Sequence, residues 1–184
     1  MKIKKTDINE YASTQPLKVK NWLIAIDKLM TDDGCRVISK TVSNSKRTDS
    51  KFTYASKKTK KTVCIINIGT SGCNISLRGN HFIHLNDKEN ILDELPEDMF
   101  LAVRGRVSCG CRNPNHSINP DYDCVHGVAG LYTYKGETFL TCLYSGFDFK
   151  LDENTNFDIL TKWIELEVAF DGEIKALQLP RQKS

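Results

Sequence analysis

Long apolar runs are absent from this chain of 184 residues. No segment approaches the roughly 20 apolar residues that a membrane-spanning helix needs. The N-terminal stretch Met1–Asp7 also lacks the apolar core of a secretory signal peptide. By default we expect a cytoplasmic protein, in which thiols stay reduced. The cysteine count of seven agrees with this expectation, because an odd number excludes complete internal pairing into disulfides.

An internal repeat and a recognisable catalytic motif are also missing. The stretch Gly69–Gly72 has the glycines of a phosphate-binding loop, but it lacks the lysine and the following helix. It therefore predicts a hairpin turn. The length suits one domain spanning residues 1–184, and the apolar content is sufficient for one core.

The predicted elements follow the order helix, strands, helix. This order indicates an α+β fold, in which an antiparallel sheet has helices packed on one face. The clearest helix spans residues 17–30, where apolar side chains recur at three- and four-residue spacing. Thr14 can cap its start, and Gly34 marks its end. The remaining expected elements are strands at 52–56, 62–68, 73–78, 100–107, 127–134 and 137–144, and short helices at 7–12 (capped by Thr6) and 86–95.

Residues 156–170 fit two patterns. Their apolar side chains recur at the spacing of a helix and also at the alternation of a strand. We prefer a helix over 156–167, because Asn156 or Asp158 can cap it.

Basic charge is concentrated in the first third of the chain. Residues 1–61 hold 15 lysines and arginines against 6 acids, whereas residues 62–184 hold 11 against 17. The polar, aperiodic residues 41–51 predict a flexible basic loop. The densest part is 40–61, with eight basic residues and one acid, Asp49. A polyanion could bind there, with Lys57, Lys58, Lys60 and Lys61 as its contacts. We favour the simpler interpretation of a solvated surface, because charge runs are usually only soluble surface.

The stretch 109–126 holds three of the seven cysteines and two of the four histidines. Thiolate and imidazole are the ligands that zinc prefers, usually four in a tetrahedron. Cys109 and Cys111 form one pair, and Cys124 and His126 form another. The turn-rich residues between the pairs make a long loop, which a metal joining its ends would stabilise. The sequence therefore predicts a closed, structural zinc site and a metal-knotted loop.

Two further residues compete as ligands. His116 qualifies if the loop folds over the site. Cys142 is opposite residue 129 if Lys135-Gly136 forms a hairpin turn, which places it far from Cys124 unless the chain curls back. The three remaining cysteines lie in apolar or strand context and are expected in the core: Cys35, Cys64 and Cys73.

A redox role and a nucleophilic role for the cysteine cluster are both less favoured than metal binding. The C-x-C spacing differs from the C-x-x-C at a helix start that lowers a thiol pKa. A cysteine nucleophile with His116 or His126 as its base lacks an identifiable orienting partner.

The segment from Cys109 to Glu165 resembles a group of uncharacterised bacterial proteins. These pair clustered cysteines with a Tyr-x-x-x-Gly hairpin, a further cysteine, a Phe-x-Phe and a closing helix. The matching residues here are Tyr132, Gly136, Cys142, Phe147, Phe149 and the stretch 158–165. The resemblance covers under a third of the chain. It favours Cys142 as a ligand and implies no activity.

These observations favour a small binding or regulatory module with a structural zinc site. Its partner would be a protein or a nucleic acid. The alternative is a metal-dependent enzyme or a metal-handling protein, in which the zinc site keeps an open position.

Overall fold

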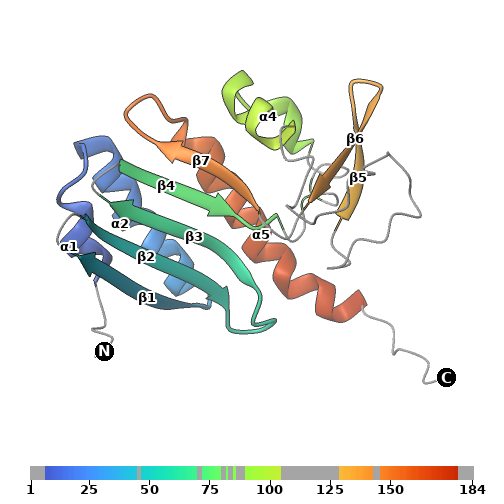
Figure 1. Cartoon of the computed structure of the whole chain (residues 1–184). Coiled ribbons are helices and arrows are strands. Elements are labelled where there is room, and N and C mark those ends of the chain that lie inside the picture. Colours follow the sequence, from blue (N-terminus) through green and yellow to red (C-terminus); the bar gives the residue numbers. More distant parts are fainter. Residues whose placement is uncertain are drawn as a thin grey trace.

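A five-stranded antiparallel sheet forms the centre of the fold (Figure 1). The computed structural model describes residues 7–44, 47–69, 72–79, 82, 85, 90–104, 129–142 and 146–177. The main sheet has the order β1-β2-β3-β4-β7, and β5 and β6 form a separate hairpin. The strands are β1 (Cys35–Asn44), β2 (Arg47–Ser56), β3 (Thr62–Gly69), β4 (Gly72–Leu77), β5 (Ala129–Tyr134), β6 (Glu137–Cys142) and β7 (Phe147–Leu151).

The helices with described bounds are α1 (Ile8–Ala12), α2 (Leu17–Asp32), α4 (Glu97–Arg104) and α5 (Phe157–Leu177), together with the 3-10 helix η1 (Ile91–Glu94). Figure 1 shows α2 and α5 on the same face of the sheet. The predicted α+β class, an antiparallel sheet with helices, is confirmed. No helix in the described part of the chain is long and apolar enough to cross a membrane.

The core lies between the sheet and these helices. Alternate strand residues face the helices, so Phe52, Ile66, Ile75 and Phe149 form one buried row across four strands. Trp163 of α5 packs on the β7 end of this row, with its ring centroid 6.0 Å from that of Phe149. Because the buried positions of this row are apolar, the strands that carry them could be predicted from the sequence.

A polar contact joins the two long helices. The indole nitrogen of Trp22 in α2 donates a hydrogen bond of 2.9 Å to the hydroxyl of Thr161 in α5. Beside it, the rings of Trp22 and Phe157 lie 5.1 Å apart. This contact sets the position of α2 relative to α5.

Two helix predictions are confirmed, with a correction at the start of one and at the end of the other. The helix predicted at 17–30 is α2, and Gly34 follows its end at a φ of 89°. Thr14 does not cap it, because its hydroxyl donates to the Tyr11 carbonyl instead. The helix chosen for 156–167 is α5, which is longer than predicted.

The hairpin predicted around Lys135-Gly136 is confirmed. Both residues have positive φ, 48° and 81°, as a two-residue I′ turn requires. The register pairs Ala129 with Cys142, as the sequence predicts.

The flexible loop predicted at 41–51 is wrong where the structure describes it. These residues belong to the β1–β2 hairpin, with Thr41 paired to Ser50. Backbone pairing does not depend on apolar side chains, and the polar ones satisfy each other: the hydroxyls of Thr41 and Ser50 lie 3.0 Å apart. The Tyr11 hydroxyl lies 3.3 Å from that of Thr41.

The strand predicted at 100–107 is also wrong over its described part. Residues 97–104 form α4, in which Met99 and Val103 are buried four residues apart while Leu101 is 51% exposed. Glu97 and Asp98 in the first turn favour a helix start.

Two short helices differ in detail. The cap of α1 is Asp7, whose carboxylate accepts from the Asn9 backbone, and the predicted cap Thr6 lies outside the described residues. In the predicted 86–95 helix, the described part is the single turn η1.

Candidate binding site

The predicted zinc loop 109–126 lies outside the described residues. This applies to the backbone and side chains of Cys109, Cys111, His116, Cys124 and His126. Cys142 ends β6, and only its backbone is described. Within the described residues, no three His, Cys, Asp or Glu side chains are grouped as metal ligands. The zinc site stays a prediction.

The four lysines predicted to bind polyanions lie together in the β2–β3 turn. All four are exposed: Lys57, Lys58, Lys60 and Lys61. The Ser56 hydroxyl accepts hydrogen bonds of 3.0 and 3.1 Å from the backbone nitrogens of Lys58 and Thr59. The Lys60 ammonium donates to the Lys57 carbonyl at 2.7 Å. The turn is therefore locally ordered, and one of its cations is engaged by the turn itself.

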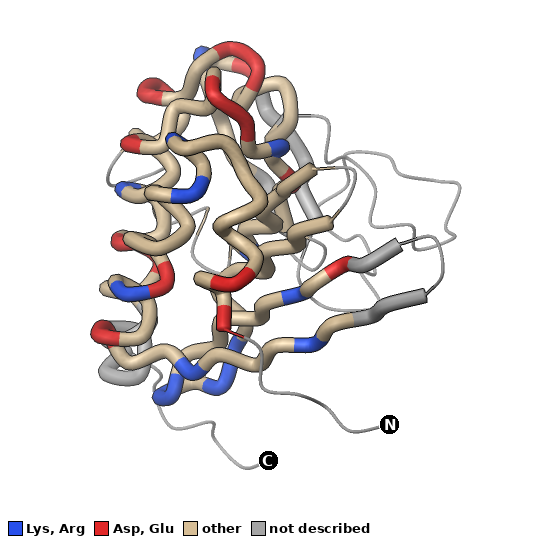
Figure 2. The backbone as a smooth tube through the Cα atoms, turned by 90° about the vertical axis from the view of Figure 1, so that its left-hand side faces the viewer, with Lys and Arg blue, Asp and Glu red and all other residues tan. Residues whose placement is uncertain are grey.

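Negative charge lies next to this turn. The Lys57 backbone nitrogen donates to the Gly34 carbonyl at 2.9 Å, which places the turn beside the C-terminus of α2. That helix end carries Asp32 and has no basic residue in its last turn. Because a helix C-terminus is a centre of partial negative charge, the turn lysines offset it. In Figure 2 the lysines of this turn lie at the lower end of the tube, with most acidic segments above. The arrangement favours a solvated surface over a polyanion site.

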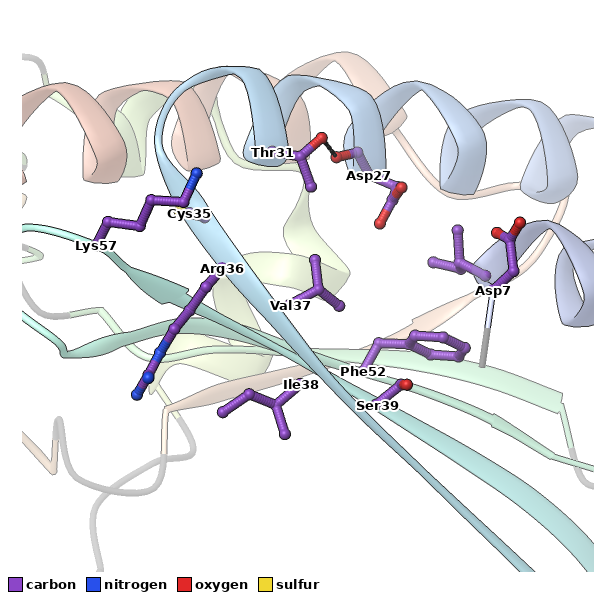
Figure 3. A pocket seen from close by; sticks show the side chains of 11 residues that line it. Asp7, Asp27, Thr31, Cys35, Arg36, Val37, Ile38, Ser39, Phe52 and Lys57 are labelled. Atoms are coloured by element: carbon purple, nitrogen blue, oxygen red, sulfur yellow. Dashed lines mark hydrogen bonds between the residues drawn. The ribbon is translucent and has the colours of Figure 1, made fainter. Parts of the chain in front are cut away.

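A groove lies between α2 and the edge strand β1 (Figure 3). Its volume is about 710 Å³. Asp27 and Thr31 reach toward it from α2, while Val37 and Phe52 face it from the sheet. The remaining lining residues are Asp7, Ile8, Cys35, Arg36, Ile38, Ser39 and Lys57. The groove thus combines an apolar floor with carboxylates and the two cations Arg36 and Lys57.

A hydrogen bond joins the two walls of the groove at their base. The Tyr54 hydroxyl of β2 donates to Asp27 Oδ1 at 2.7 Å. Burial, followed by this hydrogen bond and the charge of Asp27, raises the pKa of Tyr54 above its usual value. The phenol therefore stays a neutral donor, and the half-buried Asp27 carboxylate keeps one fixed partner.

Two thiols of the core, Cys64 and Cys73, are unsuited to nucleophilic chemistry. Burial raises the pKa of the Cys64 thiol, with a further contribution from Cys35. Burial also raises the pKa of Cys73 to about 12. Because the thiolate is the reactive form, these cysteines act as small core residues, as the sequence predicts.

Comparisons with protein-family models, with curated proteins and with solved structures found no match.

Sequence reasoning missed the groove. Asp27 lies on a predicted helix and Val37 just before the predicted loop, and neither pattern indicates that they meet. Only an expectation that β1 is an edge strand beside α2 would have brought them together. The lysine turn was found, because its residues are adjacent in sequence.

The raised pKa values predict a loss of stability at high pH. The thiols and Tyr54 titrate at their ordinary values of 9.0 and 10.0 in the unfolded chain but not in the folded protein. As the pH rises, the unfolded chain therefore loses these protons before the folded protein does. The contribution of these groups to the free energy of unfolding is complete below pH 9 and falls above it. Each group contributes a slope of up to about 1.4 kcal/mol per pH unit. Urea unfolding from pH 8 to 10.5 measures this slope. Cys64→Ala should reduce the slope of the unfolding free energy against pH, whereas Ile66→Val should leave it unchanged. Equal slopes for the two variants would contradict the raised pKa of Cys64.

Nucleic-acid binding is expected to be weak and unselective. Random duplex and single strands should bind wild-type protein at low salt and dissociate at physiological salt, because counterion release dominates. Replacing all four turn lysines with Gln should abolish the low-salt binding more than Lys20→Gln and Lys28→Gln on α2 do. Fluorescence anisotropy measures both. Tight binding that survives physiological salt would contradict the solvated-surface interpretation, and no binding at low salt would remove nucleic acid as a partner.

Proposed function

We propose that this chain is a cytoplasmic binding module, with its ligand in the α2–β1 groove and a structural zinc in segment 109–126. The observation that carries binding is the groove. Its volume of about 710 Å³ lies within the range of roughly 300–1,000 Å³ typical of ligand sites. An apolar floor with a few placed polar groups is also the usual lining of such sites.

The chemistry of the groove supports binding more than catalysis. Asp27 is held by Tyr54, and the phenol is kept protonated. These groups can fix the orientation of a ligand, since a held carboxylate accepts hydrogen bonds in one direction. The alternative, an open zinc site in an enzyme or a metal-handling protein, rests on the cysteine cluster alone.

The zinc proposal rests on the ligand spacing in the sequence. Cys109, Cys111, Cys124 and His126 supply a complete tetrahedral set, with His116 and Cys142 as alternates. A reducing cytoplasm would keep such thiol ligands available.

Ligand occupancy of the groove is testable by amide NMR. A library of small molecules and short peptides should contain ligands that shift the resonances of Asp27, Thr31 and Val37 together. Thr31→Phe narrows the groove and should abolish these shifts, whereas Ile24→Phe, on the same helix but outside the groove, should preserve them. Ligands that shift only resonances elsewhere would contradict the groove as the binding site.

Metal content tests the zinc site. The purified protein should contain one zinc per chain by elemental analysis. Cys109→Ser and Cys124→Ser should each release it and loosen the loop while the core stays folded, because metal-binding energy also holds local structure. Cys35→Ser, in β1, is the matched control and should retain the metal. Equal zinc content in all three variants would refute the site, and a zinc-bound water would favour the enzyme.

A further inference from the structure

Asp27 is the polar group that the groove offers to a ligand. Its Oδ1 accepts the hydrogen bond of 2.7 Å from the Tyr54 hydroxyl. Within the described part of the chain, Asp27 forms no ion pair, and its second carboxylate oxygen has no protein donor. That oxygen is not among the buried unpaired atoms, so a ligand in the groove can reach it. Figure 3 shows the side chain extending from α2 into the space between the helix and the sheet. One bond therefore orients the carboxylate, and acceptor capacity is left for a ligand.

The surroundings of this carboxylate are apolar. The Thr31 hydroxyl donates to the carbonyls of Asp27 and Lys28, at 2.8 and 3.0 Å, so it is turned back onto the helix. Thr31 therefore contributes its methyl group to the groove. Half-buried Val37 and buried Phe52 line the groove from the sheet. A ligand thus meets one charged acceptor beside an apolar surface.

Positive charge lies away from Asp27. Arg36 lines the groove, but Figure 3 shows it pointing away from the helix. Lys57 lies past the end of α2, because its backbone nitrogen donates to the Gly34 carbonyl. In Figure 3, Lys57 and Asp27 lie on opposite sides of Thr31. Neither cation forms an ion pair with Asp27, so the negative charge of this carboxylate acts on whatever occupies the groove.

We propose that the groove binds a small organic amine, with its ammonium group on Asp27 and its apolar body over Val37 and Phe52. This deepens the proposed function and rests on it. A hydrogen bond from an ammonium to a carboxylate is charge-assisted and about twice as strong as a neutral one. Burial of the apolar body supplies affinity, while the few polar groups of such a site fix the orientation. Asp27 would repel an anion of the same shape.

Matched amines and alcohols test the proposal on the full chain. The probes are tryptamine and phenethylamine, and their controls are tryptophol and phenethyl alcohol, which carry a hydroxyl in place of the ammonium. Each amine should bind about tenfold more tightly than its alcohol, because only the amine forms the charge-assisted bond. It should also shift the amide resonances of Asp27, Thr31 and Val37 together. Indolepropionate, which carries the opposite charge, should not bind. Isothermal titration measures the affinities, and amide NMR locates the site.

A pair of charge variants separates Asp27 from a general effect of acidity. In Asp27→Asn the amide oxygen can still accept from Tyr54, so the fold should be retained while the charge is lost. This variant should bind each amine no more tightly than its alcohol. Asp32→Asn removes the same charge from an exposed position on the same helix, outside the groove, and should keep the preference for amines. The wild-type comparison decides the proposal even if Asp27→Asn is unstable.

The outcomes separate this proposal from the groove itself. Equal affinity of wild-type protein for amines and alcohols, or a preference that Asp27→Asn retains, overturns the amine proposal. Tighter binding of Nα-acetyl-lysine amide than of either amine would assign the groove to a lysine side chain of a partner protein and would also overturn it. If neither amine shifts the groove amides while other ligands do, the amine proposal fails and the proposed function stands. If no ligand shifts the groove amides, both fail.

Discussion

The hydrogen bond from Tyr54 to Asp27 sets the position of α2 relative to the sheet, and the groove beside β1 depends on that position. It joins α2 to β2, the second strand of the sheet, at 2.7 Å. Losing one partner of a part-buried pair costs about 1–3 kcal/mol, so the bond holds the helix at that distance from the edge. α1 contacts β1 at Thr41, whose hydroxyl lies 3.3 Å from that of Tyr11, whereas Val37 remains only half-buried. The groove between α2 and β1 follows from this placement.

Aromatic side chains pack tightly at the other edge of the sheet, where β7 lies. Trp163 of α5 is fully buried, and its ring lies 5.5 Å from Phe147 and 5.7 Å from Phe82. Such rings stabilise a core through their large buried area. The protein therefore combines a rigid β7–α5 side with an open β1–α2 side. A binding module needs this combination, because a fixed scaffold holds the groove in one shape before the ligand arrives.

Much of the fold was predictable because it depends on local signals. The spacing of Val19, Trp22 and Ile26 predicted α2, and Lys135-Gly136 predicted both the hairpin and its register. The failures arose where long-range contacts decide the structure. Residues 41–51 look like a loop, yet residues 41–44 of β1 pair with residues 47–50 of β2. The apolar run after Pro96 resembles a strand, but burial at helical spacing makes it α4. The groove joins α2 to β1, and no local pattern encodes that contact.

Amide NMR of the protein with a groove ligand bound tests the central claim most directly. The ligand should shift the amide resonances of Asp27, Thr31 and Val37 together, because all three line the groove. Tyr54→Phe removes the hydrogen bond that holds Asp27 and should weaken the binding of the same ligand. Shifts confined to the β2–β3 turn at residues 58–61, with Asp27, Thr31 and Val37 unchanged, would show that the ligand binds the lysines and would contradict the account.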